Sequence, residues 1–245
     1  MKHNSITAAI IIIGNEILSG KTQDLNIQFL AIELGNLGIR LKEVRVVPDV
    51  ERDIIEAVNL LRKKYTYIFT TGGIGPTHDD ITAKTIAMAF DDELILNPKA
   101  KEKIHQYLIS LGREMTQEHE IMAYIPKSAT LLLNYETGAP GFKIDNVFVM
   151  AGVPYIMQAI FQEAKKHLRT GIPIISKSIE VKIPESVLAE DFSNLQNKYP
   201  EIEMGSYPFK TENTWKTNLV LRGDNYELID KAMDELEQII KNVSK

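Results

Sequence analysis

The sequence predicts an α/β protein built on an open, mostly parallel sheet with helices on both of its faces. Three observations predict this class. Short apolar segments alternate with longer segments whose apolar residues recur at helical spacing. Residues 8–13 are apolar at every position, as a parallel strand covered on both faces requires. Loops that contain glycine follow several predicted strands, and such loops carry the ligands in sheets of this kind.

The first half of the chain alternates strands and helices. After the strand at residues 8–13, apolar residues at positions 27, 30, 31, 34 and 37 predict a helix, which Gly38 is suited to end. A second strand covers residues 40–47, and a helix follows Asp49. A third strand covers residues 67–71, and a third helix begins near Asp80. This β-α-β-α-β-α order implies right-handed crossovers and a parallel sheet.

The rest of the chain changes character near residue 170. Before that point we expect helices at 98–112 and 114–123, strands at 131–133 and 147–150, and a helix at 154–168 that begins with proline. Beyond it, strands at 175–183, 202–207 and 217–222 combine with a helix at 184–198 and a last helix with apolar positions from 229 to 240. We therefore predict an α/β domain at residues 1–170 and a small α+β subdomain at residues 171–245.

The composition narrows the classes of function. Of the 245 residues, 44% are hydrophobic, which suffices for a core, and the net charge of -5 argues against a nucleic-acid partner. The absence of Cys excludes disulfide scaffolds, thiolate metal sites and Cys nucleophiles. With only 5 His, a hard cation with oxygen ligands is the favoured kind of metal. The longest apolar run, residues 6–13, is far shorter than the ~20 residues of a membrane span, so we expect a cytoplasmic protein with no membrane partner.

The loop at residues 72–82 is the first candidate for a ligand site. Gly72, Gly73 and Gly75 leave backbone N–H groups free to approach a ligand, and the helix N-terminus that follows favours phosphate. Asp79 and Asp80 add two carboxylates there, which points to a divalent cation between the carboxylates and the phosphate. The alternative is structural, with one Asp capping the helix and the other interacting with the helix dipole.

Three further loops lie at the same predicted edge of the sheet. The loop after the first strand contains Glu16, placed to face the cleft, and Asp24, which either caps the next helix or contacts a ligand. Asp49 follows the second strand and is either a ligand contact or a helix N-cap. Residues 151–154 follow a later strand. Taken alone, these loops are also consistent with polar connections that have capping Asp residues.

Four motifs, taken in order, resemble one family. They are Gly14-Asn15-Glu16-Ile17-Leu18-Ser19-Gly20 followed by Asp24 and Asn26, then Gly72-Gly73-Ile74-Gly75-Pro76-Thr77-His78-Asp79-Asp80-Ile81-Thr82, Thr137-Gly138-Ala139-Pro140-Gly141-Phe142 and Gly152-Val153-Pro154. They are similar to the molybdopterin-binding-like domain of competence/damage-inducible CinA proteins and of eukaryotic FAD synthases. The resemblance covers residues 6–168, and Gly205-Ser206-Tyr207-Pro208 with the last strand and helix resembles the family's small subdomain. The His at position 78, directly before the Asp pair, resembles the motif of the FAD-synthase branch of the family.

The resemblance implies a three-layer α/β/α sandwich related to molybdopterin adenylyltransferases of the Mog/MoaB type. In those relatives an Asp after the second strand and an Asp opening the helix after the glycine loop serve metal and nucleotide chemistry. By motif these positions fall on Asp49 and Asp80, whereas Asp79 belongs to the CinA-like pattern. The CinA-like domain is linked to metal-dependent pyrophosphatase activity on ADP-ribose, and its FAD-synthase counterpart to FAD diphosphatase activity. The resemblance also implies a homo-oligomer.

The resulting hypothesis is a hydrolase that splits the pyrophosphate of ADP-ribose or FAD into AMP and the other phosphate. The expected cofactor is a divalent cation, Mg²⁺, Mn²⁺ or Co²⁺, held by the catalytic Asp80, Asp79 and Asp49. The alternatives are a molybdopterin adenylyltransferase-like enzyme and a non-catalytic nucleotide- or molybdopterin-binding module. From the length we expect neither the deamidase domain of full-length CinA proteins nor the synthase domain of FAD synthases. The substrate-binding residues are predicted to be Gly14, Asn15, Glu16, Gly20, Asp24, Asn26, Gly72, Gly73, Gly75, Pro76, Thr77, Thr82, Gly152 and Pro154.

Overall fold

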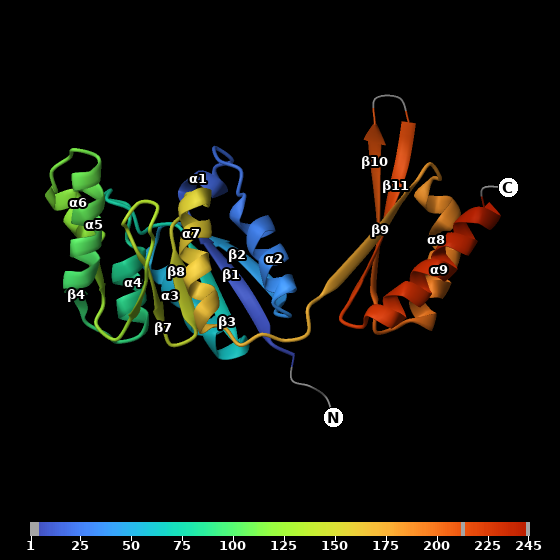
Figure 1. Cartoon of the computed structure of the whole chain (residues 1–245), viewed down its shortest axis with the longest axis horizontal. Coiled ribbons are helices and arrows are strands. Elements are labelled where there is room, and N and C mark those ends of the chain that lie inside the picture. The colour runs from blue at the N-terminus through green and yellow to red at the C-terminus, as the bar shows by residue number, and fades with distance from the viewer. Residues whose placement is uncertain (1–4, 212–213, 244–245) are drawn as a thin grey trace. The chain divides into compact units, whose positions relative to one another are not determined.

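The computed structural model describes residues 5–211 and 214–243 (Figure 1). The chain divides into two compact units, of which the first contains the residues up to 34 together with 39–171. The second contains residues 35–38 and those from 172 onward. None of the helices in the described ranges is both long and apolar enough to cross a bilayer.

A six-stranded sheet forms the centre of the first unit. In chain order its strands are β1 (Thr7–Ile13), β2 (Arg40–Val47), β3 (Tyr67–Thr71), β6 (Thr130–Leu132), β7 (Gly141–Ile144) and β8 (Val147–Met150). In the sheet they stand in the order β2-β1-β3-β8-β7-β6. The first four strands of this order run parallel, and β7 runs antiparallel to both of its neighbours. The predicted mostly parallel sheet is therefore confirmed, with β7 as the strand that the sequence did not reveal.

Helices cover both faces of this sheet (Figure 1). They are α2 (Asn26–Asn36), α3 (Glu51–Lys64), α4 (Thr82–Ala89) and α7 (Pro154–Ala164), and α7 continues into the 3-10 turn η1 (Lys165–His167). The short helix α1 (Asn15–Leu18) follows β1 and buries none of its residues. On one face, Ile54 of α3 and Ile86 of α4 pack in one core with Ile11 of β1. On the other face, Phe161 of α7 lies edge-on to Phe29 of α2 and to Phe69 of β3. The rings and branched side chains of these residues exclude water from both faces, which accounts for the apolar strands.

An excursion between α4 and β6 adds a small subassembly to the first unit. It consists of β4 (Leu94–Leu96), α5 (Pro98–Ser110), α6 (Gln117–Ile121) and β5 (Tyr124–Pro126). The two strands pair antiparallel, and Ala100, Ile104 and Leu108 of α5 pack with Ala123. Both helices were predicted, but α6 is shorter than the predicted 114–123, and the two strands were not predicted. Three residues are too few for a strand pattern to show in the sequence.

The second unit is the predicted small α+β unit. It contains β9 (Ile175–Val181), α8 (Glu185–Lys198), β10 (Glu203–Thr211), β11 (Thr214–Gly223) and α9 (Tyr226–Val243). The strands form an antiparallel sheet in the order β10-β11-β9. Leu219 and Leu221 of β11 alternate toward the core that Leu188 of α8 and Leu236 of α9 complete. The residues that alternate with them, Asn218, Val220 and Arg222, are only partly buried, and this alternation is what a sheet covered on one face requires.

Candidate functional site

The carboxyl ends of four neighbouring strands bring the candidate loops together. In the parallel pairs Ile13 of β1 lies beside Val47 of β2, and Thr71 of β3 lies beside both Ile12 and Met150 of β8. The loops that begin at Gly14, Pro48, Gly72 and Ala151 therefore start from one edge of the sheet. This is the edge at which open parallel sheets bind ligands.

Two glycines let the β3–α4 loop pass close to the sheet. Gly72 and Gly73 have φ angles of +108° and +68°, in the left-handed region that other residues rarely adopt. A Cβ on Gly72 would lie 2.0 Å from the carbonyl oxygen of Ile13, and one on Gly73 would lie 2.1 Å from Thr82 Oγ1. The Gly72 N–H donates to the Met150 carbonyl (3.1 Å), and the buried Thr82 hydroxyl donates to the Gly72 carbonyl (3.0 Å). The loop is thus held by a backbone hydrogen bond to β8 and by the side chain of Thr82.

Asp79 and Asp80 share the hydroxyl of Thr77. Asp80 Oδ2 lies 2.7 Å from Thr77 Oγ1 and accepts from the Thr77 N–H at 2.8 Å. Asp79 Oδ1 also lies within hydrogen-bonding distance of Thr77 Oγ1, and this hydrogen bond lowers the pKa of Asp79 below its ordinary value. Within the described residues no side chain caps α4, which begins at Thr82. The structural alternative, in which one of these Asp residues caps the helix, is therefore wrong.

Asp49 connects two of the loops. Its Oδ2 accepts from the Asn15 N–H at 2.8 Å, and the preceding Gly14 N–H donates to the Val47 carbonyl at 3.2 Å. Asp49 thereby orients the start of α1, whereas α3 has no side-chain cap in the part of the chain that is described. The alternative that Asp49 is a helix N-cap is wrong. Glu16 folds back over Gly14, since a Cβ on Gly14 would lie 2.5 Å from its Oε1.

Asp24 and Asn26 support the edge of the site. Asp24 Oδ1 accepts from the Ile27 N–H at 2.8 Å in the first turn of α2, which is the capping role that the sequence left open. Asn26 is buried, and its Nδ2 donates to the Gly152 carbonyl at 2.8 Å. Its Oδ1 has no hydrogen-bond partner among the described residues. Asn26 therefore ties α2 to the β8–α7 loop, in which Pro154 opens α7.

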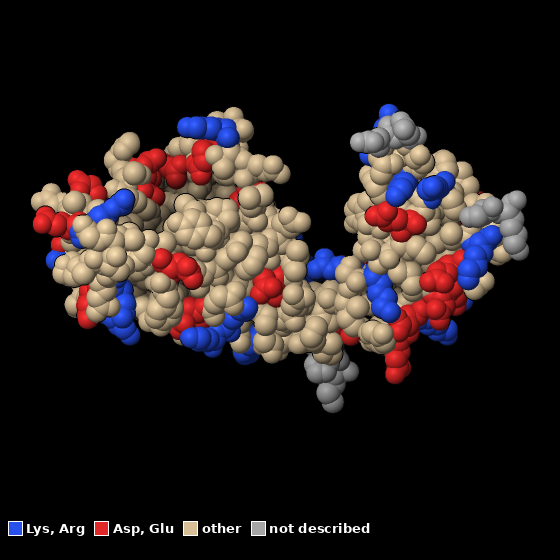
Figure 2. Space-filling model, turned by 45° about the horizontal axis from the view of Figure 1, so that its top comes forward, with Lys and Arg blue, Asp and Glu red and all other residues tan. Residues whose placement is uncertain are grey.

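A cavity of about 380 Å³ lies between these loops. Glu16, Gly152 and Asp80 line it together with the glycine loop from Gly72 to Pro76. Figure 2, in which the upper side of Figure 1 comes forward, shows acidic side chains beside a hollow in the first unit. Gly20 lies on the exposed turn after α1, and the other predicted residues outside the lining are Asp24, Asp49, Asp79, Gly14, Asn15, Asn26, Thr77, Thr82 and Pro154. The lining that the sequence did not predict consists of Ile74, Met122, Ala139, Ala151, Val153 and Ile156.

The missed lining residues are apolar, and two of them, Met122 and Ile156, lie outside every motif and candidate loop. Met122 ends α6, and Ile156 lies in the first turn of α7. Apolar residues in such places are indistinguishable from core residues in a sequence. Ile74, Ala139 and Val153 belong to three of the four motifs, and Ala151 to the loop at residues 151–154, so their positions in the sequence were the available clue.

The acidic side chains of the loops have little contact with basic groups, and the one pair among the described residues joins His78 Nδ1 to Asp79 Oδ1 at 4.0 Å. None of the Lys and Arg side chains that the structure describes forms an ion pair with Asp49, Asp79 or Asp80. In residues 5–211 and 214–243 no three Asp, Glu, His or Cys side chains form a group that could hold a metal ion, so the three predicted carboxylates are not assembled. Asp79 and Asp80 remain an adjacent pair of oxygen donors. Such a pair fits Mg²⁺, which proteins bind through one or two carboxylates together with substrate phosphates and waters.

Comparisons with known proteins agree with the fold. The family model described as "Probable molybdopterin binding domain" matches residues 9–170, and that described as "FAD synthase, middle domain" matches residues 173–244. A protein of Archaeoglobus fulgidus is 29% identical over 236 residues, which are 95% of this chain and 97% of that protein. A competence-damage inducible protein of Clostridioides difficile is 32% identical over 243 residues, and this chain spans 58% of its length. The crystal structure of the protein CinA with unknown function from Thermoplasma acidophilum is similar with a TM-score of 0.61 and 29% identity, over 67% of this chain and 98% of that one.

Proposed function

The chain belongs to the molybdopterin binding domain family, and on that premise we propose that it hydrolyses the diphosphate of an ADP-containing dinucleotide, ADP-ribose or FAD, to AMP and the other phosphate. The observation that carries this proposal is the cavity of about 380 Å³ in which the glycine loop and the Asp80 carboxylate lie together. A diphosphate needs donors for its oxygens and positive charge for its anions. The N–H groups of Gly73 and Gly75 in the lining would serve as donors, whereas that of Gly72 already donates to Met150, and the acidic pair would supply the ligands for a cation.

The glycine loop is suited to bind the diphosphate. Three glycines of the loop, Gly72, Gly73 and Gly75, line the cavity with backbone atoms only, because they have no side chains. Helix α4 begins a few residues later, at Thr82. Peptide N–H groups at a helix N-terminus attract phosphate because the helix dipole places partial positive charge there. The bonds from Gly72 and Thr82 fix the loop before the substrate arrives, which lowers the cost of ordering it on binding.

Asp80 is the central acidic residue of the proposal. It lines the cavity and lies over Gly75, whose Cβ would be 2.7 Å from Asp80 Oδ2. Asp80 and Asp79 would hold the divalent cation, and both carboxylates are hydrogen-bonded to Thr77, which lowers the pKa of Asp79. A cation bound there neutralises the charge of the phosphates and acidifies a bound water.

The remaining residues position the reacting groups. Hydrolysis adds a water oxygen to one phosphorus, breaks the bond from that phosphorus to the bridging oxygen, and passes the water proton to a base. Glu16 is the other carboxylate in the lining and is the proton acceptor of this proposal. Asp49 acts through Glu16 by orienting the start of α1, and is a positioning residue. No covalent intermediate is required, because positioning and charge stabilisation carry most phosphoryl-transfer catalysis.

The decisive experiment measures AMP release from ADP-ribose and from FAD with Mg²⁺, Mn²⁺, Co²⁺ or EDTA. We expect release that depends on the metal, stops in EDTA and collapses in Asp80→Ala. A matched control is Glu56→Ala, which removes an exposed carboxylate from α3 and should release AMP as the wild type does. The preferred dinucleotide decides between the two substrates. Absence of turnover with either dinucleotide under every metal contradicts the proposal and favours a nucleotide- or molybdopterin-binding module.

A further inference from the structure

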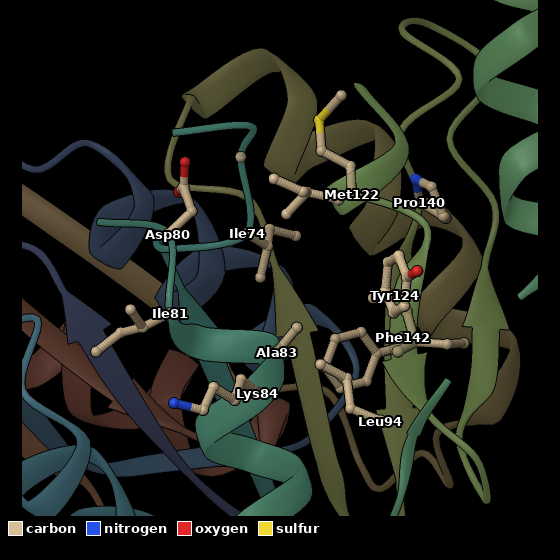
Figure 3. Close-up of a pocket in the computed structure, with 13 residues that line it drawn as sticks. Ile74, Asp80, Ile81, Ala83, Lys84, Leu94, Met122, Tyr124, Pro140 and Phe142 are labelled. Atoms are coloured by element: carbon tan, nitrogen blue, oxygen red, sulfur yellow. The ribbon is translucent and has the colours of Figure 1, made fainter. Parts of the chain in front are cut away.

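A second cavity adjoins the first across Asp80. Its volume is about 300 Å³, at the lower end of the range of small-molecule pockets (Figure 3). Ile74, Gly75, Asp80 and Met122 line both cavities. A ligand that contacts Asp80 in one cavity can therefore extend into the other.

The second cavity is lined mainly by apolar side chains from distant parts of the chain. Ile74 and Ala83 face Tyr124 and Phe142 across it (Figure 3). Tyr124 comes from β5 of the excursion, and Phe142 from β7. Pro140 and Phe142 also belong to the Thr137–Phe142 motif, for which the proposed function has no role. The lining is completed by Ile81, Lys84, Leu94, Ile121 and Ile125.

Charged groups stand only at the border of this lining. Asp80 lies where the two cavities meet. The ammonium of Lys84 lies 2.6 Å from Glu51 Oε1, and in Figure 3 it points away from Tyr124 and Phe142. The other lining side chains, all of them described, are apolar apart from the hydroxyl of Tyr124. Away from its border with the first cavity, the lining side chains therefore offer few partners for a sugar or a phosphate, whose unpaired burial is unfavourable.

A flat ring matches this chemistry. Aromatic rings pack well against Tyr and Phe, and the flexible thioether of Met122 adapts to a ring edge. We propose that the second cavity is a subsite for a planar aromatic ring, joined through its sugar or ribityl chain to the phosphate held beside Asp80. The inference rests on the proposed function and deepens it, because it makes the ring a determinant of substrate choice. The ring can come from either half of the substrate, as the purine of AMP or the isoalloxazine of FMN.

The test measures binding rather than turnover, by titration calorimetry of the whole chain with Mg²⁺ present. The probes are AMP, FMN, ribose 5-phosphate and inorganic pyrophosphate. We expect AMP or FMN to bind about tenfold or more tightly than ribose 5-phosphate, which carries the phosphate without the ring. The probe that shows this advantage identifies which half of the substrate enters the cavity.

Two variants assign the ring to the second cavity. Tyr124→Ala removes a partly exposed ring from the lining and should abolish the advantage of the ring-bearing probe while leaving pyrophosphate binding unchanged. Ala83→Phe fills the cavity from α4 and should do the same, and Met88→Phe places the same ring on an exposed position of α4 as the control. Ala83 packs against the core, so Tyr124→Ala keeps the test valid if Ala83→Phe does not fold.

The outcomes separate this inference from the proposed function. Equal affinity for ribose 5-phosphate and for both ring-bearing probes overturns the subsite, even if AMP release from dinucleotides is observed. A ring advantage that survives in folded Tyr124→Ala also overturns it. A ring advantage lost in Tyr124→Ala upholds the subsite, even if no dinucleotide is hydrolysed.

Discussion

Two carboxylate regions of the first unit are built in opposite ways. Glu43 on β2 accepts from Arg45 Nε at 2.7 Å, from Lys64 Nζ at 2.8 Å and from the Tyr65 hydroxyl at 2.7 Å. These donors lower its pKa to about 2, with the hydrogen bond from Lys64 as the largest cause. Asp80 in the β3–α4 loop instead accepts from the N–H and the hydroxyl of Thr77, both of which are neutral.

The difference separates carboxylates that are paired with Lys or Arg, here called structural acids, from carboxylates such as Asp80 that bond only to neutral groups. The second unit repeats the structural type, since Glu235 accepts from Lys198 Nζ at 2.7 Å and from the Tyr199 hydroxyl at 2.7 Å. Burial, reinforced by Glu235, raises the pKa of Tyr199 to about 12. Glu43 and Glu235 are neutralised by the protein's own cations. Asp80 is oriented without being neutralised, which suits it to a cation that arrives with the substrate.

The largest expected effect comes from breaking the backbone support of the β3–α4 loop. Gly72→Ala places a Cβ against the Ile13 carbonyl at a φ of +108°. We expect the free energy of unfolding to fall by about 3 kcal/mol or more, together with loss of AMP release. Urea denaturation measures the first and the AMP assay the second.

Gly112→Ala is the matched control for this substitution. Gly112 also has a positive φ, of +67°, but a Cβ there would meet nothing within 4 Å. The expected loss is only about 1–2 kcal/mol, because backbone strain acts alone. If the two variants lose equal free energies of unfolding, the close approach of Gly72 to β1 does not contribute to stability.

The next largest effect is expected from Asp80→Asn, which removes the charge of the carboxylate while keeping its hydrogen bonds to Thr77. Asn at position 80 can still accept from Thr77 through its amide oxygen, so Asp80→Asn should change the free energy of unfolding by less than about 0.5 kcal/mol. AMP release should fall by about 10²-fold or more. Urea denaturation and the AMP assay on one preparation measure both. Strong destabilisation by Asp80→Asn would place Asp80 with Glu43 among the structural acids.

Glu43→Gln should show the reverse pattern, with stability reduced and AMP release retained. Because the pKa of Glu43 is lowered from 4.5 to about 2, its stabilising effect is fully present above pH 4.5 and is lost as the pH falls toward 2. The difference in urea midpoint between wild type and Glu43→Gln should therefore be large at pH 7 and shrink across that interval. A difference that does not depend on pH would contradict the role of the charge.

The smallest effect concerns the tuning of Asp79. Thr77→Val removes the hydroxyl that lowers the pKa of Asp79, so this pKa should rise toward its ordinary value. Thr77→Ser keeps a hydroxyl and should keep the lowered pKa. Titration of the Asp79 carboxyl carbon by NMR compares the three proteins. An unchanged pKa of Asp79 in Thr77→Val would show that the Thr77 hydroxyl does not lower it.

The regular elements were predictable because their patterns are local. The bounds of β2 and β3 match the predicted residues 40–47 and 67–71, since long apolar or alternating runs with glycine or proline at their ends leave little choice. β7, by contrast, begins at Gly141, the last of the turn-rich residues 138–141, and has only four residues, so its pairing with β8 decides its structure. The helix after the glycine loop begins at Thr82, close to the predicted start near Asp80, and the Asp80 side chain bonds to Thr77 instead of capping it.

By itself the sequence determined the fold class, the small second unit and the loops that carry the candidate site. Their signals are spacings within a few residues, which persist in any fold that buries the apolar positions. Only the tertiary structure decided how those loops meet. Asp49 accepts a hydrogen bond from the backbone N–H of Asn15, 34 positions away in the chain. Tyr124 and Phe142 line the same cavity as Ile74 although they lie far from it in the sequence. Contacts of this kind depend on strand order and on the packing of several elements at once, so local sequence patterns do not predict them.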